Sequence, residues 1–341
     1  MDSYTSLLEG MWASLHTRGT ESSGYVRLRI SEVNACAAYV AKRISTGLRA
    51  FVAEFATSAL PRLDGLPQAD GVELLVETIR PGRSGRTRLI LALTDDQFSD
   101  EYTVFIGDVV ARLAGATTER EAAAILRETF ERWLRFMRLH QTEQFPNEKR
   151  VGLIGELLVF KRLIGQSSGT KLLFGWRGCL GSHHDYTFST GSIEVKTTTS
   201  NDAHSMRITS IHQLEPAEDQ PLIVAHVHLK ATASGSVTLR ALATELKSSL
   251  SPLESQRFDE LLLSCGYHVG LDTADAEPHF ELLSGRFFGV DEGFPRLRRD
   301  AMPLGVERVT YAVALAACEP FAITKQEAVK RLRLQNGQDG E

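Results

Sequence analysis

The sequence predicts a mixed α/β (α+β) fold built in two parts, and three observations predict it. Residues 21–115 contain short segments in which apolar and polar residues alternate, as in strands with one buried face. After Pro146, helical periodicity and short apolar runs follow in the order helix, three strands, helix, strand. The 341 residues are 43% hydrophobic and 24% charged, so the chain can bury a substantial core. We therefore expect an αβββαβ core preceded by a β-rich region.

The first part is expected to be a β-rich domain over residues 1–116. Turn-forming residues separate its predicted strands, which lie at residues 25–30, 38–44, 48–55, 72–79 and 87–93. A flanking helix is expected over 101–116. A second, amphipathic helix runs to about His140, and we interpret residues 117–145 as a connecting helix.

The second part is expected to hold the core, over residues 146–250. Its predicted elements are a helix at 151–164, strands at 171–175, 184–189 and 192–199, a helix at 208–215, a strand at 222–230 and a helix at 237–250. Residues 251–341 are expected to form a C-terminal α/β extension packed on the core. Its predicted elements are a helix at 253–264, strand-like segments around 279–290 and 306–317, and a terminal helix from about Lys325 to Leu334.

Charge and cysteine content narrow the class of protein. The net charge of −5 argues against a protein that coats nucleic acid, although a local groove can still be positive. The cysteines, Cys36, Cys179, Cys265 and Cys318, are widely scattered without a CxxC pair, and we interpret them as reduced thiols.

We find no secretory leader and no apolar run of the ~20 residues that a membrane span needs. The expected location is the cytoplasm, with no membrane partner.

The helix at 151–164 carries a carboxylate on its apolar side. Leu153, Leu157 and Phe160 recur at helical spacing, and Glu156 lies on or beside the face that they form. A carboxylate there needs a partner, because an isolated buried charge is costly. Glu156 is either a boundary residue paired with an arginine or a side chain aimed at a metal or a catalytic group. Glycines flank it, which favours close packing of this helix against another backbone.

A predicted hairpin follows, and it places acidic and basic side chains together. Asp185 lies at the first end of one short strand pattern, and Glu194 and Lys196 lie two residues apart on the next, so they share a sheet face. Two carboxylates and a backbone carbonyl, here that of Val195, can hold a hard cation through oxygen. Magnesium bound there would activate water and neutralise charge on a phosphate, with Lys196 orienting the water or stabilising developing negative charge.

The spacing D-x(n)-E-x-K is by itself a weak signal, because alternating charged strands produce it often. Its context strengthens it: a preceding helix with a buried glutamate, a tight hairpin and a following helix and strand. A metal-dependent nuclease site is the first interpretation. A solvated charged strand without chemistry and a degenerate, inactive nuclease fold stay open as alternatives.

Beyond these residues, the chain resembles the bacterial PD-(D/E)XK motif proteins found among restriction–modification and phage-defence genes. The segments that carry the resemblance are GLIGELLVF, WRG, HDYTF, IEVKTTTS and MRITSIHQL, with the later GYHVG, FPRL and VTYAVALA. The resemblance implies a restriction-endonuclease-like core and a site made of Glu156, Asp185, Glu194 and Lys196. It adds Gln213, which matches a glutamine that binds DNA or orients a catalytic group in related nucleases. His184 stands where the motif has a proline, which is not a ligand.

Other signals give weaker predictions. Arg177, Arg207 and Thr198 are candidate DNA contacts, because positioning a strand needs charge and hydroxyl groups near the groove. Four histidines surround the motif, but none has the spacing of a zinc helix, so a transition-metal site is the lesser interpretation; they are His183, His184, His204 and His212. No phosphate-binding loop of the GxxxxGK[ST] type is present.

The function expected from the sequence is a Mg²⁺-dependent DNA endonuclease, with Mn²⁺ as a substitute, within a restriction or phage-defence system. Because no ATPase motif is visible, a separate ATPase or helicase subunit is an expected partner, and a homodimer is left open. The alternative is a non-catalytic structural or target-recognition subunit that keeps the nuclease fold. The acidic net charge and the β-rich first region fit that alternative.

Overall fold

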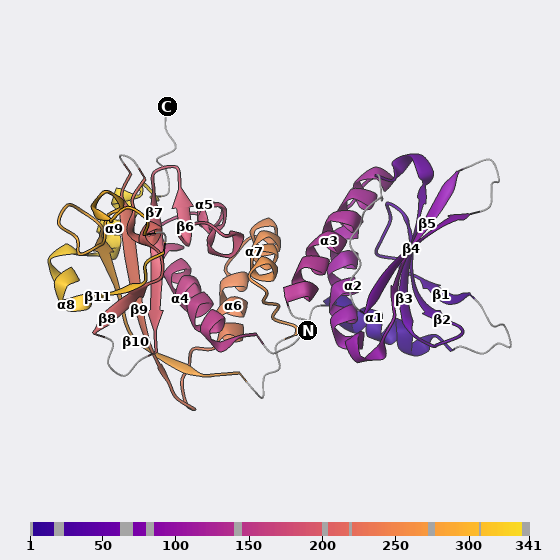
Figure 1. Ribbon diagram of the computed structural model, residues 1–341. Coiled ribbons are helices and arrows are strands. Elements are labelled where there is room, and N and C mark those ends of the chain that lie inside the picture. Colours follow the sequence, from indigo (N-terminus) through magenta and orange to yellow (C-terminus); the bar gives the residue numbers. More distant parts are fainter. Residues whose placement is uncertain are drawn as a thin grey trace. The chain divides into compact units, whose positions relative to one another are not determined.

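The computed structural model describes residues 3–16, 24–61, 71–79, 85–139, 145–199, 204–217, 220–271, 277–306 and 308–335 (Figure 1). The chain divides into two compact units, Met1–Thr142 and Glu143–Glu341, and each is described by itself. Of the residues predicted to lie at the boundary, 140–144 are outside the described part of the chain.

The first unit is a five-stranded sheet with three helices on one of its faces (Figure 1). Its elements are α1 (Ser3–Ser14), β1 (Tyr25–Arg29), β2 (Ala37–Arg43), β3 (Arg49–Ala56), β4 (Val72–Ile79), β5 (Arg86–Leu93), α2 (Ser99–Leu113) and α3 (Glu119–Leu139). The strands run antiparallel in the order β1-β2-β3-β5-β4. Sequence neighbours pair in β1-β2, β2-β3 and β4-β5, as short turn-separated strands favour, whereas β3 pairs with β5 and not with β4.

Side chains on the helical face of this sheet form its core. The Trp12 indole of α1 donates to the carbonyl of Ala41, and the Tyr102 hydroxyl of α2 donates to the carbonyl of Leu91. The helix α3 packs on α2, and Trp133 lies against Phe105 with ring centroids 5.5 Å apart. The helix that the sequence suggested as a connector is therefore part of the first unit, because its apolar face is buried there.

The second unit has a mixed five-stranded sheet at its centre. The elements up to the central strand are α4 (Asn147–Leu163), α5 (Gly169–Gly175), the 3₁₀ turn η3 (Gly178–Leu180), β6 (Tyr186–Phe188), β7 (Gly191–Thr198), β8 (Ser205–Ile208), the 3₁₀ turn η4 (Ile211–Leu214) and β9 (Leu222–Ala231). Those that follow are α6 (Leu239–Ser248), α7 (Pro252–Ser264), β10 (Phe280–Gly289), β11 (Tyr311–Ala314), α8 (Leu315–Cys318), β12 (Ala322–Ile323) and α9 (Lys325–Arg331). The sheet order is β12-β10-β9-β7-β6, and β7 and β9 are parallel.

The two faces of this sheet are covered differently. Helices α4, α5, α6 and α7 lie over one face and bury the larger apolar cluster, which includes Ile193 and Val195 of β7 (Figure 1). The other face carries a two-stranded sheet of β8 and β11 and a smaller cluster around Val224 and Phe288. Since neighbouring residues of β7 point to opposite faces, Glu194 and Lys196 lie on the side of the smaller cluster.

Two features bring β7 to its place. Gly191 begins the strand with φ of 144°, a conformation that favours glycine, and it closes the tight turn from β6. Gly155 of α4 packs directly against the same strand. The approach is so close that a Cβ atom at Gly155 would overlap the Thr197 hydroxyl. The predicted close approach of this helix to another chain segment is therefore found at Gly155, whereas Gly152 faces open space.

Several predicted elements differ from the structure. Residues 171–175 form part of the helix α5, which Ser168 caps by accepting from the Lys171 N–H, and are not a strand. Residues 208–215, expected as a helix, divide between the end of β8 and η4. The C-terminal extension supplies β10 and β12 to the central sheet, so it completes the core as well as packing on it.

The interpretation of all cysteines as separate thiols is wrong for two of them. Cys179 of η3 and Cys265 at the end of α7 form a disulfide, with Cα atoms 4.6 Å apart across 86 residues of sequence. Cys36 and Cys318 are free and buried. The pairing joins segments that the fold brings together, so spacing in the sequence carries no sign of it.

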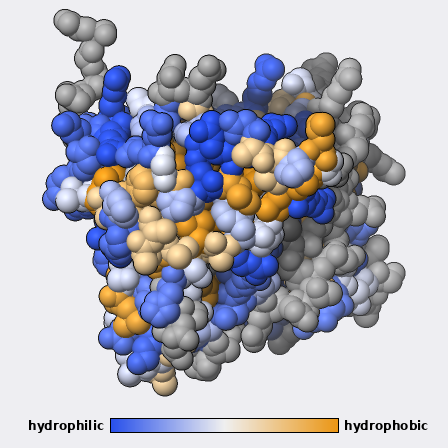
Figure 2. Space-filling model, turned by 60° about the vertical axis from the view of Figure 1, so that its left-hand side comes forward, coloured by the Kyte–Doolittle hydropathy of each residue, from blue (hydrophilic) through white to orange (hydrophobic). Residues whose placement is uncertain are grey.

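Within the described residues, no helix is long and apolar enough to cross a membrane. The face shown in Figure 2 mixes hydrophilic residues with smaller hydrophobic groups.

Candidate active site

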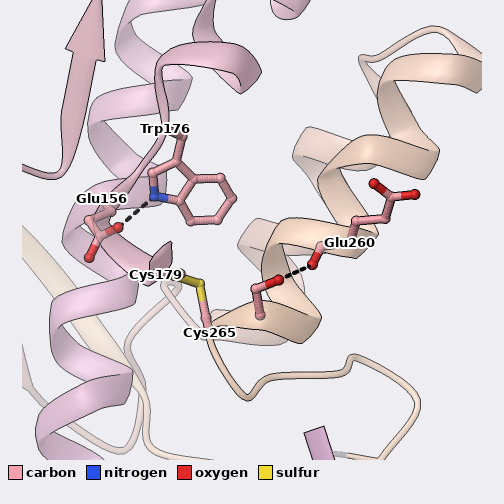
Figure 3. Close-up of a disulfide and its surroundings, with 6 residues drawn as sticks. Glu156, Trp176, Cys179, Glu260 and Cys265 are labelled. Carbon is pink, nitrogen blue, oxygen red and sulfur yellow. Dashed lines mark hydrogen bonds between the residues drawn. A yellow bond between two sulfur atoms is a disulfide. The ribbon is translucent and has the colours of Figure 1, made fainter. Parts of the chain in front are cut away.

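The first carboxylate of the site comes from α4. Glu156 accepts a hydrogen bond of 2.6 Å from the Trp176 indole, which follows α5 (Figure 3). The Tyr186 hydroxyl donates to the backbone carbonyl of Glu156 at 2.9 Å. The partner of Glu156 is thus a tryptophan N–H rather than an arginine. Both aromatic rings are fully buried, and they hold the carboxylate and its helix turn against the start of β6.

The second carboxylate, Asp185, lies directly before β6. Its backbone carbonyl accepts from the N–H groups of Arg177 and Gly178, at 2.7 and 3.0 Å. Its side chain accepts from the N–H of Val195 in β7 at 2.7 Å. A Cβ atom at Gly178 would come within 2.9 Å of both the Asp185 and the Glu156 carboxylates, so the backbone of η3 packs directly on the pair.

The third carboxylate and the lysine come from β7. Glu194 is only 2% exposed, and the Lys196 Nζ lies 2.8 Å from its Oε1. This burial contradicts the alternative of a solvated charged strand, because only a paired carboxylate is tolerated at such a position.

Lys196 also reaches across to η4. Its Nζ donates to the Gln213 side-chain oxygen at 2.8 Å. The same oxygen accepts from the backbone N–H of Thr209 at 2.9 Å, which fixes its orientation. The His184 ring bonds the backbone of His212 in this turn. The structure therefore brings Gln213 to Lys196, from a 3₁₀ turn where the sequence suggested a longer helix.

Burial and mutual repulsion shift the ionisation of all three carboxyl groups. Burial raises the pKa of Glu156 well above its usual range, and the negative charge of Asp185 adds to the effect. Burial likewise raises the pKa of Asp185, against the N–H of Val195 and the charge of Lys196. For Glu194, burial and then Asp185 raise the pKa to about 8, despite Lys196. A cluster of this kind favours a cation, which would relieve the repulsion.

The donor set suits a hard cation that keeps part of its water. Asp185 and Glu194 offer carboxylate oxygens. The pairing of β6 with β7 ends at Ile193, so the Val195 N–H is free to bond Asp185 and its carbonyl points to the same open edge. Among the described residues, no group of three or more His, Cys, Asp or Glu side chains is arranged to hold a metal by itself. Two carboxylates, one carbonyl and waters match the preference of magnesium for oxygen.

The remaining predicted residues lie on or beside η3, β7 and β8. Arg177 is exposed beside η3, and Arg207 is exposed on β8. Thr198 is partly buried at the end of β7, in register with His228 of β9.

The predicted histidines do not gather on the carboxylates. The His183 ring packs on the His212 ring with centroids 4.9 Å apart, and His212 pairs with Glu215 at 2.8 Å. His204 is exposed, and its carbonyl accepts from Leu315 of α8. Nothing in this arrangement favours the transition-metal interpretation over an oxygen site.

Three contributors to the site escaped the sequence interpretation. Trp176, known from the sequence only as part of the WRG segment, is buried, and its indole donates to Glu156. The backbone of Gly178 packs on the Asp185 and Glu156 carboxylates, and the Tyr186 hydroxyl donates to the backbone carbonyl of Glu156. The signal available for Gly178 was its place in the WRG segment, directly before a loop that returns to Asp185.

Comparison with known proteins places this chain in a family. The chain finds no match among curated proteins and none among solved structures. Residues 8–316 match the family described as "Putative PD-(D/E)XK family member, (DUF4420)". This match covers most of the chain and includes every residue of the candidate site, on a mixed α/β scaffold with a restriction-endonuclease-like, nuclease-like fold. The chain belongs to this PD-(D/E)XK family.

Proposed function

We propose that this protein is a Mg²⁺-dependent DNA endonuclease that hydrolyses phosphodiester bonds. One observation carries the proposal: Glu194 is almost fully buried, is paired with the partly buried Lys196, and precedes Val195, whose N–H bonds Asp185. Gathering three carboxylates and a lysine where little solvent reaches them costs free energy that a purely structural role does not require. Family membership supports the same chemistry, because this superfamily consists mainly of nucleases that use divalent metals.

The roles of the side chains follow from their contacts. Asp185, Glu194 and the carbonyl of Val195 would hold Mg²⁺ or Mn²⁺, with Glu156 supporting them from α4. When bound, the ion would lower the pKa of a water ligand and neutralise charge on the phosphate. Among the described residues, Lys196 uses two of its three N–H donors on Glu194 and Gln213. The third would orient water or stabilise charge on the phosphate.

The DNA contacts and the biological setting are part of the proposal. Arg177, Arg207 and Thr198 would position the strand: Arg177 directly precedes η3, Arg207 lies on β8 and Thr198 lies on β7. The expected setting is a restriction or phage-defence system in the cytoplasm. A separate ATPase or helicase subunit would then supply the motor function, and a second copy of the chain would allow both strands to be cut.

Cleavage of plasmid and phage DNA in Mg²⁺, Mn²⁺ or EDTA tests the proposal. We expect nicking in either metal, none in EDTA, and a loss of about 10²-fold or more in Lys196→Ala, as for other groups that stabilise developing charge. Lys161→Ala is the matched control, because Lys161 is a half-exposed lysine of α4 that pairs with Glu245.

Two results would contradict the mechanism. Full cleavage by Lys196→Ala would show that the lysine is not needed for the reaction. The non-catalytic alternative would be favoured if the wild-type chain binds DNA but does not cleave it, either alone or with neighbouring gene products.

A further inference from the structure

A cavity opens in the same unit as the carboxylates. It has a volume of about 490 Å³, within the usual range of ligand pockets. One wall is η4 and the residues that follow it, and the other is the segment after β10. The lining residues, here called the arginine pocket, are Ile211, Glu215, Pro216, Arg296, Leu297, Arg298, Arg299 and Asp300.

The arginine pocket shares a structural element with the candidate active site. The side-chain oxygen of Gln213 in η4 accepts from Lys196. The backbone carbonyl of the next residue, Leu214, accepts from Arg296 Nη1 at 2.6 Å. The turn η4 ends at Leu214, and Glu215 directly after it lines the pocket, so one short element borders both the lysine of the candidate site and the arginine pocket.

The charges of the pocket favour an anion. It holds three arginines against two carboxylates, and Glu215 is already paired with His212 at 2.8 Å. Arg298 and Asp300 form an ion pair of 2.8 Å with side chains 62% and 64% exposed. Such exposed pairs contribute little to stability, so the guanidinium can exchange its partner for a phosphate. Arg299 is exposed beside it.

Apolar side chains complete the wall. Ile211 and Pro216 are partly buried, and Leu297 is 41% exposed next to the arginines. A nucleotide offers both kinds of surface, since its phosphate suits a guanidinium fork and its sugar and base suit apolar contacts. Water or a simple inorganic anion would leave the apolar wall unused.

We propose that the arginine pocket binds one nucleotide of a nucleic acid strand beside the bond that the carboxylates act on. Arg298 and Arg299 hold its phosphate, and Arg296 keeps η4 in place through Leu214. The proposal deepens the nuclease function and rests on it for the identity of the strand. The binding itself needs no catalysis, so it is tested separately.

The test is filter binding of a labelled 20-nucleotide DNA, single-stranded and duplex, to the full chain in EDTA over a range of KCl concentrations. We expect Arg298→Ala/Arg299→Ala to weaken binding. Removal of one arginine that binds a phosphate lowers the slope of log K against log [KCl] by about 0.7 for single strands and 0.9 for duplex. The double variant is therefore expected to lower the slope by about 1.4 to 1.8. Arg298→Lys/Arg299→Lys keeps the charge and is expected to keep the slope.

Arg257→Ala is the matched control, because Arg257 is an arginine of α7, over the opposite face of the sheet, with an ion pair of 3.0 Å to Glu260. Circular dichroism of each variant verifies that the fold is kept.

The outcomes separate this proposal from the nuclease function. An unchanged slope in the alanine double variant, or a decrease equal to that of Arg257→Ala, overturns the pocket, even if the chain cuts DNA. A wild-type chain that binds neither oligonucleotide overturns it as well. If binding depends on Arg298 and Arg299 but the chain never cleaves DNA, the proposed nucleotide pocket is supported and the proposed nuclease activity is contradicted.

Discussion

Glu194 is a carboxyl group whose ionised form the folded chain disfavours in the absence of a cation. Its pKa is raised to about 8 by burial and then by Asp185, whereas its value in an unfolded chain is 4.5. Between these values the folded state keeps a proton that the unfolded state has released. The stability that this proton provides is present below pH 4.5 and is lost as the pH rises towards 8.

We therefore expect the free energy of unfolding, measured in EDTA by urea and circular dichroism, to fall from pH 5 to pH 8. For Glu194 this amounts to about 2–4 kcal/mol. Glu194→Gln should flatten the profile and also remove any rise in melting temperature on adding Mg²⁺. A variant that keeps both the pH dependence and the response to Mg²⁺ would show that Glu194 is neither the titrating group nor a ligand.

We expect His226 to give a pH dependence of the free energy of unfolding that has the opposite sign. It lies in β9 in register with Lys196, is 2% exposed, and neither ring nitrogen has a hydrogen-bond partner among the described residues. Burial, and then the charges of His228 and Arg286, lower its pKa from 6.5 to about 4. Its contribution to stability is thus present above pH 6.5 and lost as the pH falls towards 4.

His226→Leu should remove this loss between pH 6.5 and 4. At pH 7 it should leave stability unchanged or raise it by about 1 kcal/mol, because an unpaired buried polar group is replaced by an apolar one. Urea titrations at pH 4.5 and 7 check this. Strong destabilisation at pH 7 would mean that the imidazole has a partner that holds it.

At the scale of elements, the contact between α4 and β7 sets how close Glu156 comes to the sheet. Gly155→Ala should destabilise the chain by about 1–3 kcal/mol, because the added methyl group overlaps Thr197. Gly152→Ala, one turn earlier in the same helix, meets nothing within 4 Å and should stabilise by up to about 1 kcal/mol through helix propensity. Thermal unfolding of the two variants gives the comparison, and equal effects would show that the contact does not constrain the helix.

The disulfide joins two further elements, η3 and α7, next to the carboxylates (Figure 3). Cys265→Ser is expected to lower the free energy of unfolding by about 2–5 kcal/mol, because the unfolded chain regains the freedom of a long loop. Reduction of the wild-type chain by dithiothreitol should give the same loss, and the variant should not respond to it. A wild-type chain unaffected by reductant would contradict a stabilising bridge.

The elements also show what the sequence could and could not predict. The hairpin of β6 and β7 was predictable, because alternation and a glycine turn are local signals. The helix α5 was not, since the run Leu172–Phe174 is as compatible with a buried strand as with a helix, and a single serine before it, Ser168, is a weak cap signal. A role for Gln213 in the site was expected only through family resemblance, and its bond to Lys196 was not predicted. The pairing of Cys179 with Cys265 depends on contacts that span 86 residues.

At the scale of the whole molecule, the chain consists of two units with separate cores. The two apolar clusters of the second unit draw only on residues from 145 onwards, and its sheet takes strands from both the predicted core and the predicted extension. A core that ended at residue 250 would lack β10, which pairs with β9 along its length. The sequence placed the start of this unit near its observed position, because Pro146 precedes a strongly periodic helix.

We expect a fragment of residues 143–341 to fold by itself, since the described residues of its two apolar clusters all lie in that range. Circular dichroism should show helix and strand content, and urea should produce one cooperative transition. A fragment of residues 143–250 is the control and should not fold, because it lacks β10 and α7. A longer fragment that stays unfolded would mean that the first unit contributes to the core of the second.

The hydrogen bond from Trp176 to Glu156 has an optical consequence. The chain has three tryptophans, and two of them, Trp12 and Trp133, lie in the first unit. Trp176 is therefore the sole tryptophan in the sequence of the fragment 143–341, and its indole is the one that donates to Glu156. A change of charge on Glu156 alters the polarity around that ring. The fragment thus contains its own fluorophore, whose emission would report proton or cation binding at the site without any attached dye.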